Sequence, residues 1–235
     1  MTDDGADLPV VDPSTVDPAT VGSDAPGDRD ARAEPRVAGV LLAAGTGSRF
    51  GDANKLLATL DGEPIVRHAA RTLVDAGLDP LVVVVGYESE RVAAALDGLG
   101  VEFEIVENEA YREGQATSVR AGVAALASVD AAVFALGDMP RVDPASVRAL
   151  VDVFRSGEWT ALAAAFEGER GNPVLFDRRH FDALADVSGD RGGRRILLSG
   201  EGSVLVETGD PGVRRDVDIP KDIDALDHDA AEDET

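Results

Sequence analysis

The hydrophobic positions of this chain fall into short blocks of two kinds. Residues 37–44, 81–85 and 131–136 are almost continuously apolar, which is typical of strands that are buried on both faces of a parallel sheet. Between such blocks, apolar residues recur at helical spacing, and a glycine or a capping residue marks several of the ends. This alternation predicts a three-layer, Rossmann-like α/β fold with a mostly parallel sheet.

The complete set of predicted elements continues this order towards the end of the chain. Strands are predicted at residues 37–44, 81–85, 101–106, 131–136, 160–166, 173–176 and 203–206. Helices are predicted at residues 64–76, 89–96, 115–126, 143–154, 178–184 and 191–198, with a last one from Pro220. The later strands follow one another closely, so we expect antiparallel additions near one edge of the sheet. Ligands of such sheets bind at the carboxyl ends of the strands.

Both ends of the chain depart from this pattern. Residues 1–36 are rich in Asp, Pro, Gly and Ala, and residues 228–235 are mainly acidic. Segments of this composition bury too little apolar surface to offset the entropy of ordering the chain. The sequence therefore predicts one folded domain at residues 37–227 between two disordered acidic tails.

Composition narrows the class of protein. The 235 residues carry a formal net charge of −23 and include no cysteine, which excludes disulfides and thiol chemistry. A surface this acidic disfavours binding to nucleic acid and is typical of a salt-adapted, halophilic cytoplasm. No apolar run approaches the ~20 residues that cross a bilayer, so we expect a cytoplasmic protein without a membrane partner.

The first apolar block runs into a glycine-rich loop at residues 45–51. Its backbone N–H groups can approach a ligand closely, and Arg49 and Lys55 add positive charge, so the loop is suited to phosphates. It is not a P-loop, because Lys55 follows Asn54 rather than a glycine. It also departs from the dinucleotide-binding fingerprint, because Phe50 stands where the third glycine is needed, and this disfavours a hydride-transfer enzyme. An ordinary tight turn would explain the glycines but not the two cations.

The run Leu42-Ala43-Ala44-Gly45-x-Gly47-x-Arg49-Phe50-Gly51, followed by Lys55, resembles the signature of the MobA-like NTP-transferase family, and most of all that of the molybdenum cofactor cytidylyltransferases. The resemblance implies a nucleotidyltransferase fold over nearly all of residues 37–226. It also implies a reaction in which a phosphate oxygen attacks the α-phosphorus of a nucleoside triphosphate and releases pyrophosphate. Nucleotide-binding roles are implied for Leu42, Ala43, Ala44, Gly45 and Gly47, and catalytic roles for Arg49 and Lys55.

The same resemblance implies a Mg²⁺ site. Asp138, which follows the third apolar block in Gly-Asp-Met-Pro, resembles the family's metal ligand, although relatives often carry Asp-Gln-Pro there. Asp218 would complete the site, with Asp216 as its outer partner, and carboxylate oxygens are the ligands that Mg²⁺ prefers. Taken without the resemblance, Asp138 is a common turn residue before Pro140, and Asp218 is a helix cap.

Further segments resemble the family's substrate-binding elements. Residues 108–122 resemble the loop and helix over the nucleotide, which implies contacts from Asn108, Gly114 and Ser118; helix capping by Ser118 is the plain alternative. Gly171-Asn172-Pro173 resembles an element that more often reads Gly-His-Pro, and residues 189–194 resemble a glycine-rich segment before a helix. These two segments imply an acceptor pocket that contains Asn172 and Asp190, and ordinary turns explain the same loops.

The sequence leaves three hypotheses about function. The first is an Mg²⁺-dependent transfer of CMP from CTP to the phosphate of molybdopterin. Ala44 favours CTP, because guanylyl-transferring relatives tend to have glycine there, and a GTP-dependent guanylyltransferase is the alternative. The second is nucleotidyl transfer to a sugar phosphate or another phosphorylated small molecule. The third is a nucleotide-binding accessory protein that escorts a molybdoenzyme without catalysis. The partners implied are CTP (or GTP), a molybdopterin-type acceptor and, transiently, a molybdoenzyme or its maturation factors.

Overall fold

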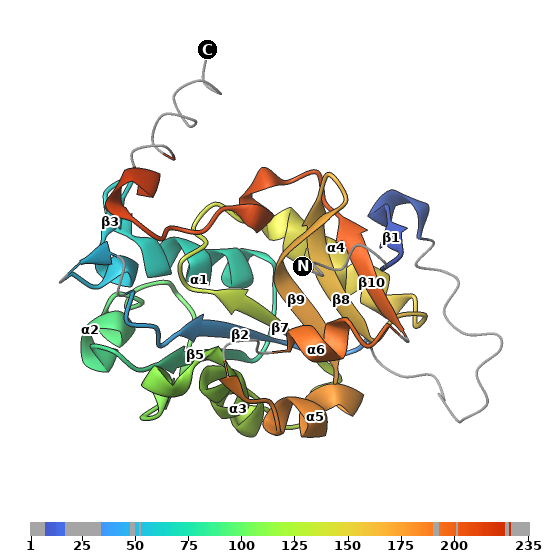
Figure 1. Cartoon of the computed structure of the whole chain (residues 1–235), viewed down its shortest axis with the longest axis horizontal. Coiled ribbons are helices and arrows are strands. Elements are labelled where there is room, and N and C mark those ends of the chain that lie inside the picture. Colours follow the sequence, from blue (N-terminus) through green and yellow to red (C-terminus); the bar gives the residue numbers. More distant parts are fainter. Residues whose placement is uncertain are drawn as a thin grey trace, which may run out of the picture.

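In the computed structural model, the described residues are 8–16, 34–47, 50–51, 53–189, 193–200, 202–223 and 226. They are organised around an eight-stranded sheet with the order β1-β10-β8-β9-β7-β2-β5-β6 (Figure 1). Its strands are β1 (Val10–Val11), β2 (Val37–Ala43), β5 (Leu81–Val85), β6 (Glu104–Glu107), β7 (Ala131–Leu136), β8 (Ala161–Phe166), β9 (Glu169–Asp177) and β10 (Ser203–Glu207). A separate hairpin pairs β3 (Thr59–Leu60) with β4 (Glu63–Pro64). The α-helices whose bounds lie within the described residues are α1 (Ile65–Asp75), α2 (Ser89–Ala94), α3 (Gln115–Ala125), α4 (Pro144–Arg155), α5 (Phe181–Ala185) and α6 (Arg194–Leu197), and the predicted last helix begins at Pro220.

The sheet confirms the predicted, mostly parallel α/β fold, but the prediction that the antiparallel additions lie near one edge is wrong, because the antiparallel strand β9 lies inside the sheet between β8 and β7. Its strand pairs are parallel except for those of β9, which runs antiparallel to β7 on one side and to β8 on the other. Strand β2 lies between β7 and β5 and is parallel to both. The carboxyl ends of β2 and β7 therefore meet at one edge of the sheet, where the glycine-rich loop and Asp138 follow them.

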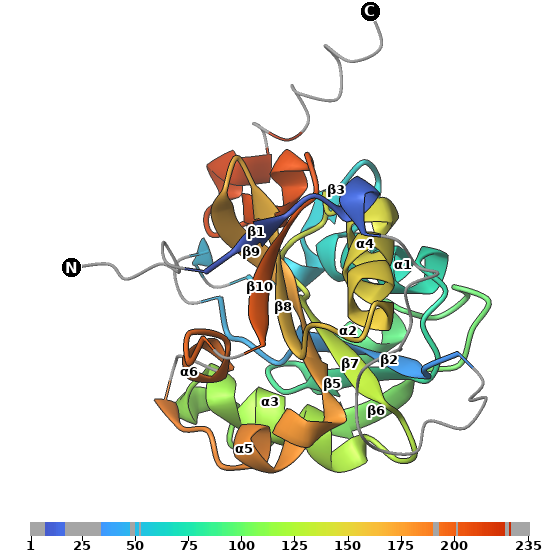
Figure 2. The same ribbon diagram turned by 90° about the vertical axis from the view of Figure 1, so that its right-hand side faces the viewer.

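Helices cover both faces of this sheet (Figures 1 and 2). Helices α1 and α4 lie on one face, and α3 and α5 lie on the other. The buried side chains divide in the same way: Leu73 of α1 and Leu150 of α4 belong to one cluster, and Val119 of α3 and Leu184 of α5 belong to the second. Because both faces are close-packed, the ends of the strands are held in fixed positions.

Strand β9 changes its pairing where it passes Pro173. Proline has no N–H group to donate to a ladder, so inside a sheet it requires a bulge or the end of a pairing. Both occur here. The register of β9 on β8 shifts between Ala163 and Ala165, and the pairing of β9 with β7 ends at Val174 and Phe134. The chain around Asn172 is thereby released from β7 at the carboxyl edge of the sheet.

Part of residues 1–36, which the sequence predicted to be disordered, is ordered in the structure. Strand β1 pairs in parallel with β10, and a 3₁₀ turn follows at Pro13–Thr15. Asp12 caps this turn, because its Oδ1 accepts a hydrogen bond from the N–H group of Ser14 at 2.9 Å. Val11 packs against the main core, so contacts with the sheet order this segment. Residues 1–7 and 17–33, and the acidic tail at 228–235, lie outside the described residues.

One predicted strand is shorter than expected. The strand predicted at residues 101–106 begins only at Glu104, and Val101 lies outside it with 41% of its surface exposed.

Within the part of the chain that the structure describes, no helix combines the length and the apolar character needed to cross a membrane.

Candidate active site

The amine of Lys55 lies between two carboxylates at the carboxyl edge of the sheet. Its Nζ atom is 2.5 Å from Oδ2 of Asp138 and 3.3 Å from Oδ1 of Asp218. The side chain of Lys55 is only 11% exposed, so the ion pairs are partly shielded from water. The fold thus brings together three residues that the sequence analysis had assigned to one site.

A short 3₁₀ helix, Lys55–Leu57, presents the lysine. Asn54 caps this helix: its Oδ1 accepts a hydrogen bond from the N–H group of Leu56 at 3.0 Å, and its Nδ2 donates to the carbonyl oxygen of Tyr87 at 3.3 Å. Asn54 is buried, so water does not compete strongly for these bonds. The cap fixes the backbone of Lys55 to the loop that follows β5.

The backbone around Asp218 is attached directly to that of Asp138. The N–H group of Val217 donates to the carbonyl oxygen of Asp138 at 2.9 Å. On the other side, Oδ2 of Asp222 accepts hydrogen bonds from the N–H groups of Asp218 and Ile219 at 2.7 and 2.8 Å. The position of Asp218 is therefore set from both sides, although it lies far from Asp138 in the sequence.

The pKa values in this cluster follow from burial and charge. Burial lowers the pKa of the Lys55 amine, but the negative charges of Asp138 and Asp218 outweigh burial and raise that pKa above its usual value. Partial desolvation, together with the charges of Asp138 and Asp218, raises the pKa of the Asp216 carboxyl group. Lys55 is consequently positive at neutral pH, and it lies in a cluster that favours further positive charge.

The carboxylates of Asp138, Asp216 and Asp218 fit a divalent metal ion. One oxygen atom from each lies within 4.8 Å of the others. The Oδ1 atom of Asp138 is buried and accepts no hydrogen bond from any residue in the described ranges. A buried carboxylate oxygen without a donor is costly unless a cation compensates it. Three hard oxygen donors of this kind suit Mg²⁺ or Mn²⁺.

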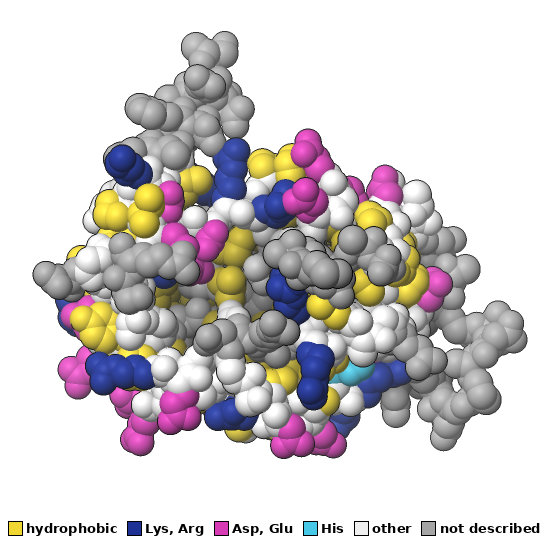
Figure 3. Space-filling model, in the orientation of Figure 1, with side chains coloured by type: hydrophobic (Ala, Val, Ile, Leu, Met, Phe, Trp, Pro, Cys, Tyr) yellow, Lys and Arg dark blue, Asp and Glu magenta, His cyan; other side chains and the backbone are white. Residues whose placement is uncertain are grey.

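A cleft of about 490 Å³ opens beside these carboxylates, which is large enough for a nucleotide-sized ligand. Its walls come from the ends of β2 and β7, the loop after β2 and the start of α3. The predicted site residues that line it are Leu42, Ala44, Gly45, Lys55, Gly114, Ser118 and Asp138. Figure 3 shows this face of the molecule, with hydrophobic side chains at the bottom of a central hollow and acidic side chains beside it.

The two glycines that begin the loop have different roles. Gly47 has a φ of +57°, and a Cβ atom at that position would lie 2.9 Å from Cγ of Lys55. Gly45 has open space where its Cβ atom would stand, and it faces the cleft. Gly47 is therefore required by the packing of Lys55, whereas Gly45 leaves the backbone accessible to a ligand. Arg49, the other predicted catalytic cation, lies outside the described residues.

Two residues predicted to contact the nucleotide are buried in the protein. Ala43 belongs to the core beneath the sheet. The amide of Asn108 donates to the hydroxyl groups of Thr117 and Ser118 at 2.8 and 3.0 Å, and its Oδ1 accepts from the N–H group of Ala110 at 3.1 Å. Asn108 therefore attaches the start of α3 to the loop after β6, and through Ser118 it shapes the cleft wall indirectly.

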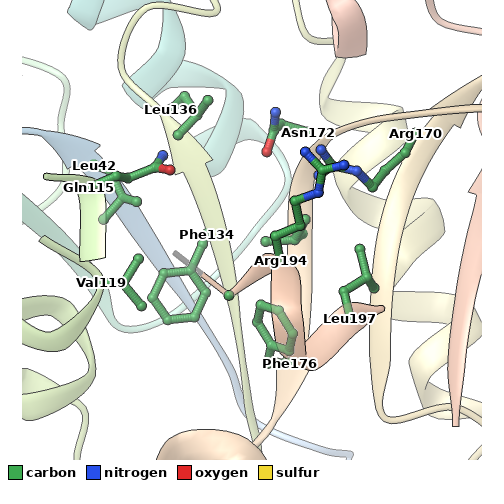
Figure 4. A pocket seen from close by; sticks show the side chains of 12 residues that line it. Leu42, Gln115, Val119, Phe134, Leu136, Arg170, Asn172, Phe176, Arg194 and Leu197 are labelled. Carbon is green, nitrogen blue, oxygen red and sulfur yellow. The ribbon is translucent and has the colours of Figure 1, made fainter. Parts of the chain in front are cut away.

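A second cavity of about 200 Å³ adjoins the cleft (Figure 4). The two share Leu42, Gln115 and Leu136. Asn172, which the sequence analysis assigned to the acceptor pocket, lines this second cavity. Asp190, the other residue assigned there, lies outside the described residues.

Several side chains at the site received no role from the sequence. Gln115 stands where the cleft and the second cavity meet. Arg112 lines the cleft, and its Cζ lies 5.2 Å from the centroid of the Tyr111 ring, a cation–π contact. Asn54 could have been found from the preference for asparagine at the start of a helical turn. The positions of Arg112 and Gln115 depend on the tertiary structure.

This fold and site define a nucleotidyltransferase: a mostly parallel sheet places a glycine-rich loop, a buried lysine and a carboxylate cluster at one edge. The chain belongs to the MobA-like NTP transferase domain family, whose model matches residues 39–204. The matched region contains Lys55 and Asp138 and ends before Asp216 and Asp218.

Known proteins resemble most of the chain. Nicotine blue oxidoreductase from Paenarthrobacter nicotinovorans is 33% identical over 192 residues, which are 78% of this chain and 93% of that protein. Purine catabolism protein PucB from Bacillus subtilis is 32% identical over 206 residues, which are 82% of this chain and 96% of that protein.

Solved structures resemble the chain equally broadly. Rv0371c from Mycobacterium tuberculosis matches with a TM-score of 0.72 and 30% identity over 83% of this chain and 100% of that one. A structure of Rv0371c in complex with manganese matches with a TM-score of 0.68 and 27% identity over 82% of this chain and 98% of that one.

Proposed function

We propose that this protein transfers CMP from CTP to the phosphate of molybdopterin and releases pyrophosphate. The observation that carries the proposal is the ammonium group of Lys55, held between Asp138 and Asp218 beside a nucleotide-sized cleft. Nucleotidyl transfer needs cations at this kind of site, because negative charge builds up on the phosphate oxygens and the leaving group. Membership of the NTP-transferase family supports the reaction class.

Each residue of the cluster has a distinct role in this proposal. Asp138 and Asp218 hold Mg²⁺, and Asp216 is the outer carboxylate. The metal ion would neutralise charge on the triphosphate and on the pyrophosphate. Lys55 binds oxygens of the α-phosphate while the acceptor phosphate attacks, and Arg49 adds a second positive charge from the glycine-rich loop.

The backbone around the cleft would hold the rest of the triphosphate. Gly45 has open space beside its backbone at the cleft, and Gly114 and Gln115 bring the start of α3 into the cleft wall. A helix start of this kind favours negative charge. Ser118 adds a hydroxyl group to the same wall.

Ala44 supports CTP rather than GTP as the donor. It lies in the wall of the cleft and is tightly packed, because a Cβ atom on Gly86 would lie 2.9 Å from both Cβ and the carbonyl oxygen of Ala44. The preference for CTP rests on the residue type at position 44, because guanylyl-transferring relatives tend to have glycine there. The acidic composition supports action in a salt-adapted cytoplasm, where the product would pass to a molybdoenzyme or its maturation factors.

The name of one relative, nicotine blue oxidoreductase, suggests a redox reaction as the alternative. The glycine-rich loop disfavours it for this chain, because Phe50 replaces the third glycine of the dinucleotide-binding fingerprint. The lysine and carboxylate cluster instead suits the charge of a triphosphate.

Pyrophosphate release tests the proposal. The protein is incubated with Mg²⁺ and CTP or GTP, with molybdopterin or a panel of sugar phosphates as acceptor. We expect release with CTP and molybdopterin, reduced by about 10²- to 10³-fold in Asp138→Asn. Asp152→Asn removes an exposed charge on α4 and should leave the rate unchanged. No release with any combination would reject the transferase, and release only with sugar phosphates would replace the acceptor. Biological activity that survives both Lys55→Ala and Asp138→Ala would favour the accessory protein.

A further inference from the structure

A small apolar cluster, distinct from the two main cores, lies beside the candidate active site. Its buried members come from the β3–β4 hairpin, the start of α1 and the C-terminal segment: Leu60, Ile65, Val217 and Leu226. Phe50, at the end of the glycine-rich loop, and Ile223 are partly buried against them. In Figure 1 the C-terminal segment, drawn in red, runs to the hairpin of β3. The cluster therefore joins the segment that follows Lys55 to the segment that contains Asp218.

The segment that contains Asp218 is held by contacts at its two ends. In the described part of the chain after β10 it joins no strand of the sheet. At one end, the N–H group of Val217 donates to the carbonyl oxygen of Asp138 at 2.9 Å. At the other end, Leu226 is buried in the small apolar cluster. The position of Asp218 therefore depends on both attachments.

Arg141 contacts the far end of this segment and the hairpin together. Its Nη1 atom is 2.8 Å from Oδ2 of Asp61, and its Nη2 atom donates to the carbonyl oxygen of Leu226 at 3.3 Å. Asp61 and Gly62 form the turn of the hairpin with φ angles of +51° and +81°, as a tight two-residue hairpin turn requires. A guanidinium group carries several N–H donors in fixed directions, so one arginine can join two segments.

The backbone of Arg141 is itself closely packed. A Cβ atom on Gly212 would lie 2.0 Å from the carbonyl oxygen of Arg141, so only glycine allows that turn to approach so closely. Arg141 lies in the same loop after β7 as Asp138. Through its own loop, the hairpin and the C-terminal segment, Arg141 therefore connects the three parts of the chain that present Lys55, Asp138 and Asp218.

We propose that Arg141 is a positioning residue of the metal site. By holding the hairpin and Leu226 together, it keeps Asp218 close to Asp138, although Arg141 itself does not line the cleft. The inference rests on the proposed function for the metal ion that these carboxylates hold. Charge alone predicts the opposite effect, because removal of a cation near carboxylates strengthens the binding of a divalent ion. The direction of the change in Mn²⁺ affinity therefore separates positioning from simple electrostatics.

Mn²⁺ titrations followed by electron paramagnetic resonance test this with the full chain and without nucleotide. The variants are Arg141→Gln, Asp61→Asn, whose new side chain tolerates the same positive φ, and the control Arg148→Gln. Arg148 lies on α4, donates to the carbonyl oxygen of Asp75 at 2.9 Å and does not line the cleft. We expect Arg141→Gln and Asp61→Asn to weaken Mn²⁺ binding by about 3- to 10-fold, less than the ~10–100-fold that loss of a direct partner of a metal ligand costs, and Arg148→Gln to leave it unchanged.

Hydrogen exchange gives a second readout. The N–H group of Val217 is protected by its bond to Asp138, so a peptide that contains Val217 should exchange faster in Arg141→Gln, while a peptide from β7 should not change. Unchanged or stronger Mn²⁺ binding in Arg141→Gln overturns the proposal, and so does unchanged exchange in the first peptide. The ion pair with Asp61 is partly exposed, so the melting temperature should fall by no more than about 4 °C.

Two further outcomes keep the test decisive. If Arg141→Gln does not fold, Asp61→Asn decides through the peptide that contains Val217, and wild-type exchange there counts against the proposal. A wild type that binds no Mn²⁺ overturns the inference together with the metal site. Failure of the proposed function alone looks different: Mn²⁺ binding is weakened in Arg141→Gln, and the wild type releases no pyrophosphate.

Discussion

The ammonium of Lys55 and the carboxylate of Asp138 are 2.5 Å apart, and they reach this contact from the loops that follow two adjacent parallel strands, β2 and β7. The same ammonium also contacts Asp218. A divalent cation on Asp138 and Asp218 must therefore compete with Lys55 for the negative charge of these two carboxylates. In the proposed reaction, Lys55 exchanges these carboxylates for the oxygens of the triphosphate.

Lys55→Gln should separate the two roles of this lysine. Pyrophosphate release should fall by about 10²- to 10³-fold, because a positioned charge on the phosphates is lost. In the absence of nucleotide, however, the affinity for Mn²⁺ should rise by roughly tenfold, since the competing ammonium is gone. The free energy of a tenfold change is well below the ~4 kcal/mol with which two charges 4 Å apart interact near a protein surface. Mn²⁺ binding is measured by electron paramagnetic resonance. Lys221→Gln, at the only other lysine and on the surface, is the control; a weaker affinity for Mn²⁺ in Lys55→Gln would contradict the competition.

Alanine at the two loop glycines should have opposite consequences. Gly47→Ala introduces a Cβ atom 2.9 Å from Cγ of Lys55 at a φ of +57°, so it should lower the melting temperature and displace the lysine. Gly45→Ala meets no atom of the described structure and should leave the melting temperature unchanged, while it weakens the binding of CTP. Calorimetric unfolding and equilibrium binding of CTP measure the two effects. Normal CTP affinity in Gly45→Ala would contradict an approach of phosphates to that backbone.

Asn54→Ala should reduce activity beyond its effect on stability. Loss of the cap should cost about 0.5–2 kcal/mol of unfolding free energy, and it should also free the backbone of Lys55 from its attachment to Tyr87. Asp177→Ala is the matched control, because Asp177 caps a 3₁₀ helix distant from the cleft by accepting from the N–H group of Arg179 at 2.8 Å. Chemical denaturation and pyrophosphate release are compared in both variants. If Asn54→Ala and Asp177→Ala lose the same stability and have the same activity, Asn54 does not position Lys55.

The contribution of Glu63 to stability should depend on pH. Its carboxylate accepts hydrogen bonds from Arg71 at 2.7 and 3.0 Å and from Arg67 at 3.1 Å. These bonds, those of Arg71 first, lower the pKa of Glu63 from an ordinary 4.5 to about 2. A lowered pKa in the folded state means that the stabilisation is complete above the ordinary pKa and is lost as the pH falls towards about 2. The difference in melting temperature between the wild type and Glu63→Gln should therefore shrink as the pH falls from 6 to 3, and a constant difference would contradict this assignment.

Much of the sheet could be predicted because its central strands are continuous apolar runs in the sequence. The bounds of β5 and β7 agree with the apolar runs at 81–85 and 131–136, since strands buried on both faces need apolar residues at every position. Strand β1 gave no such signal. It has two residues in a polar segment and is ordered by pairing with β10, which no local pattern reveals. Strand β9 begins at Glu169, earlier than the predicted Pro173, because a bulge accommodates the proline within the strand.

The candidate site could be predicted where a residue of suitable chemistry follows the end of a buried strand. Lys55 and Asp138 both follow buried strands whose carboxyl ends meet, so their proximity follows from topology. Asn108 was expected at the nucleotide, and the structure instead engages its amide with Thr117 and Ser118. The sequence could not distinguish these uses, because the residues around an asparagine do not reveal whether its amide binds the protein or a ligand.

In the proposed reaction, the carboxylates beside Lys55 hold the metal ion of a triphosphate bound in the cleft. Anomalous diffraction from crystals grown with CTP and Mn²⁺ tests it most directly. We expect a Mn²⁺ peak on the carboxylates of Asp138 and Asp218, with the triphosphate beside Gly45 and the Lys55 amine on its oxygens. Nucleotide bound in the crystal with no Mn²⁺ at Asp138, or with Lys55 turned away from the phosphates, would contradict it.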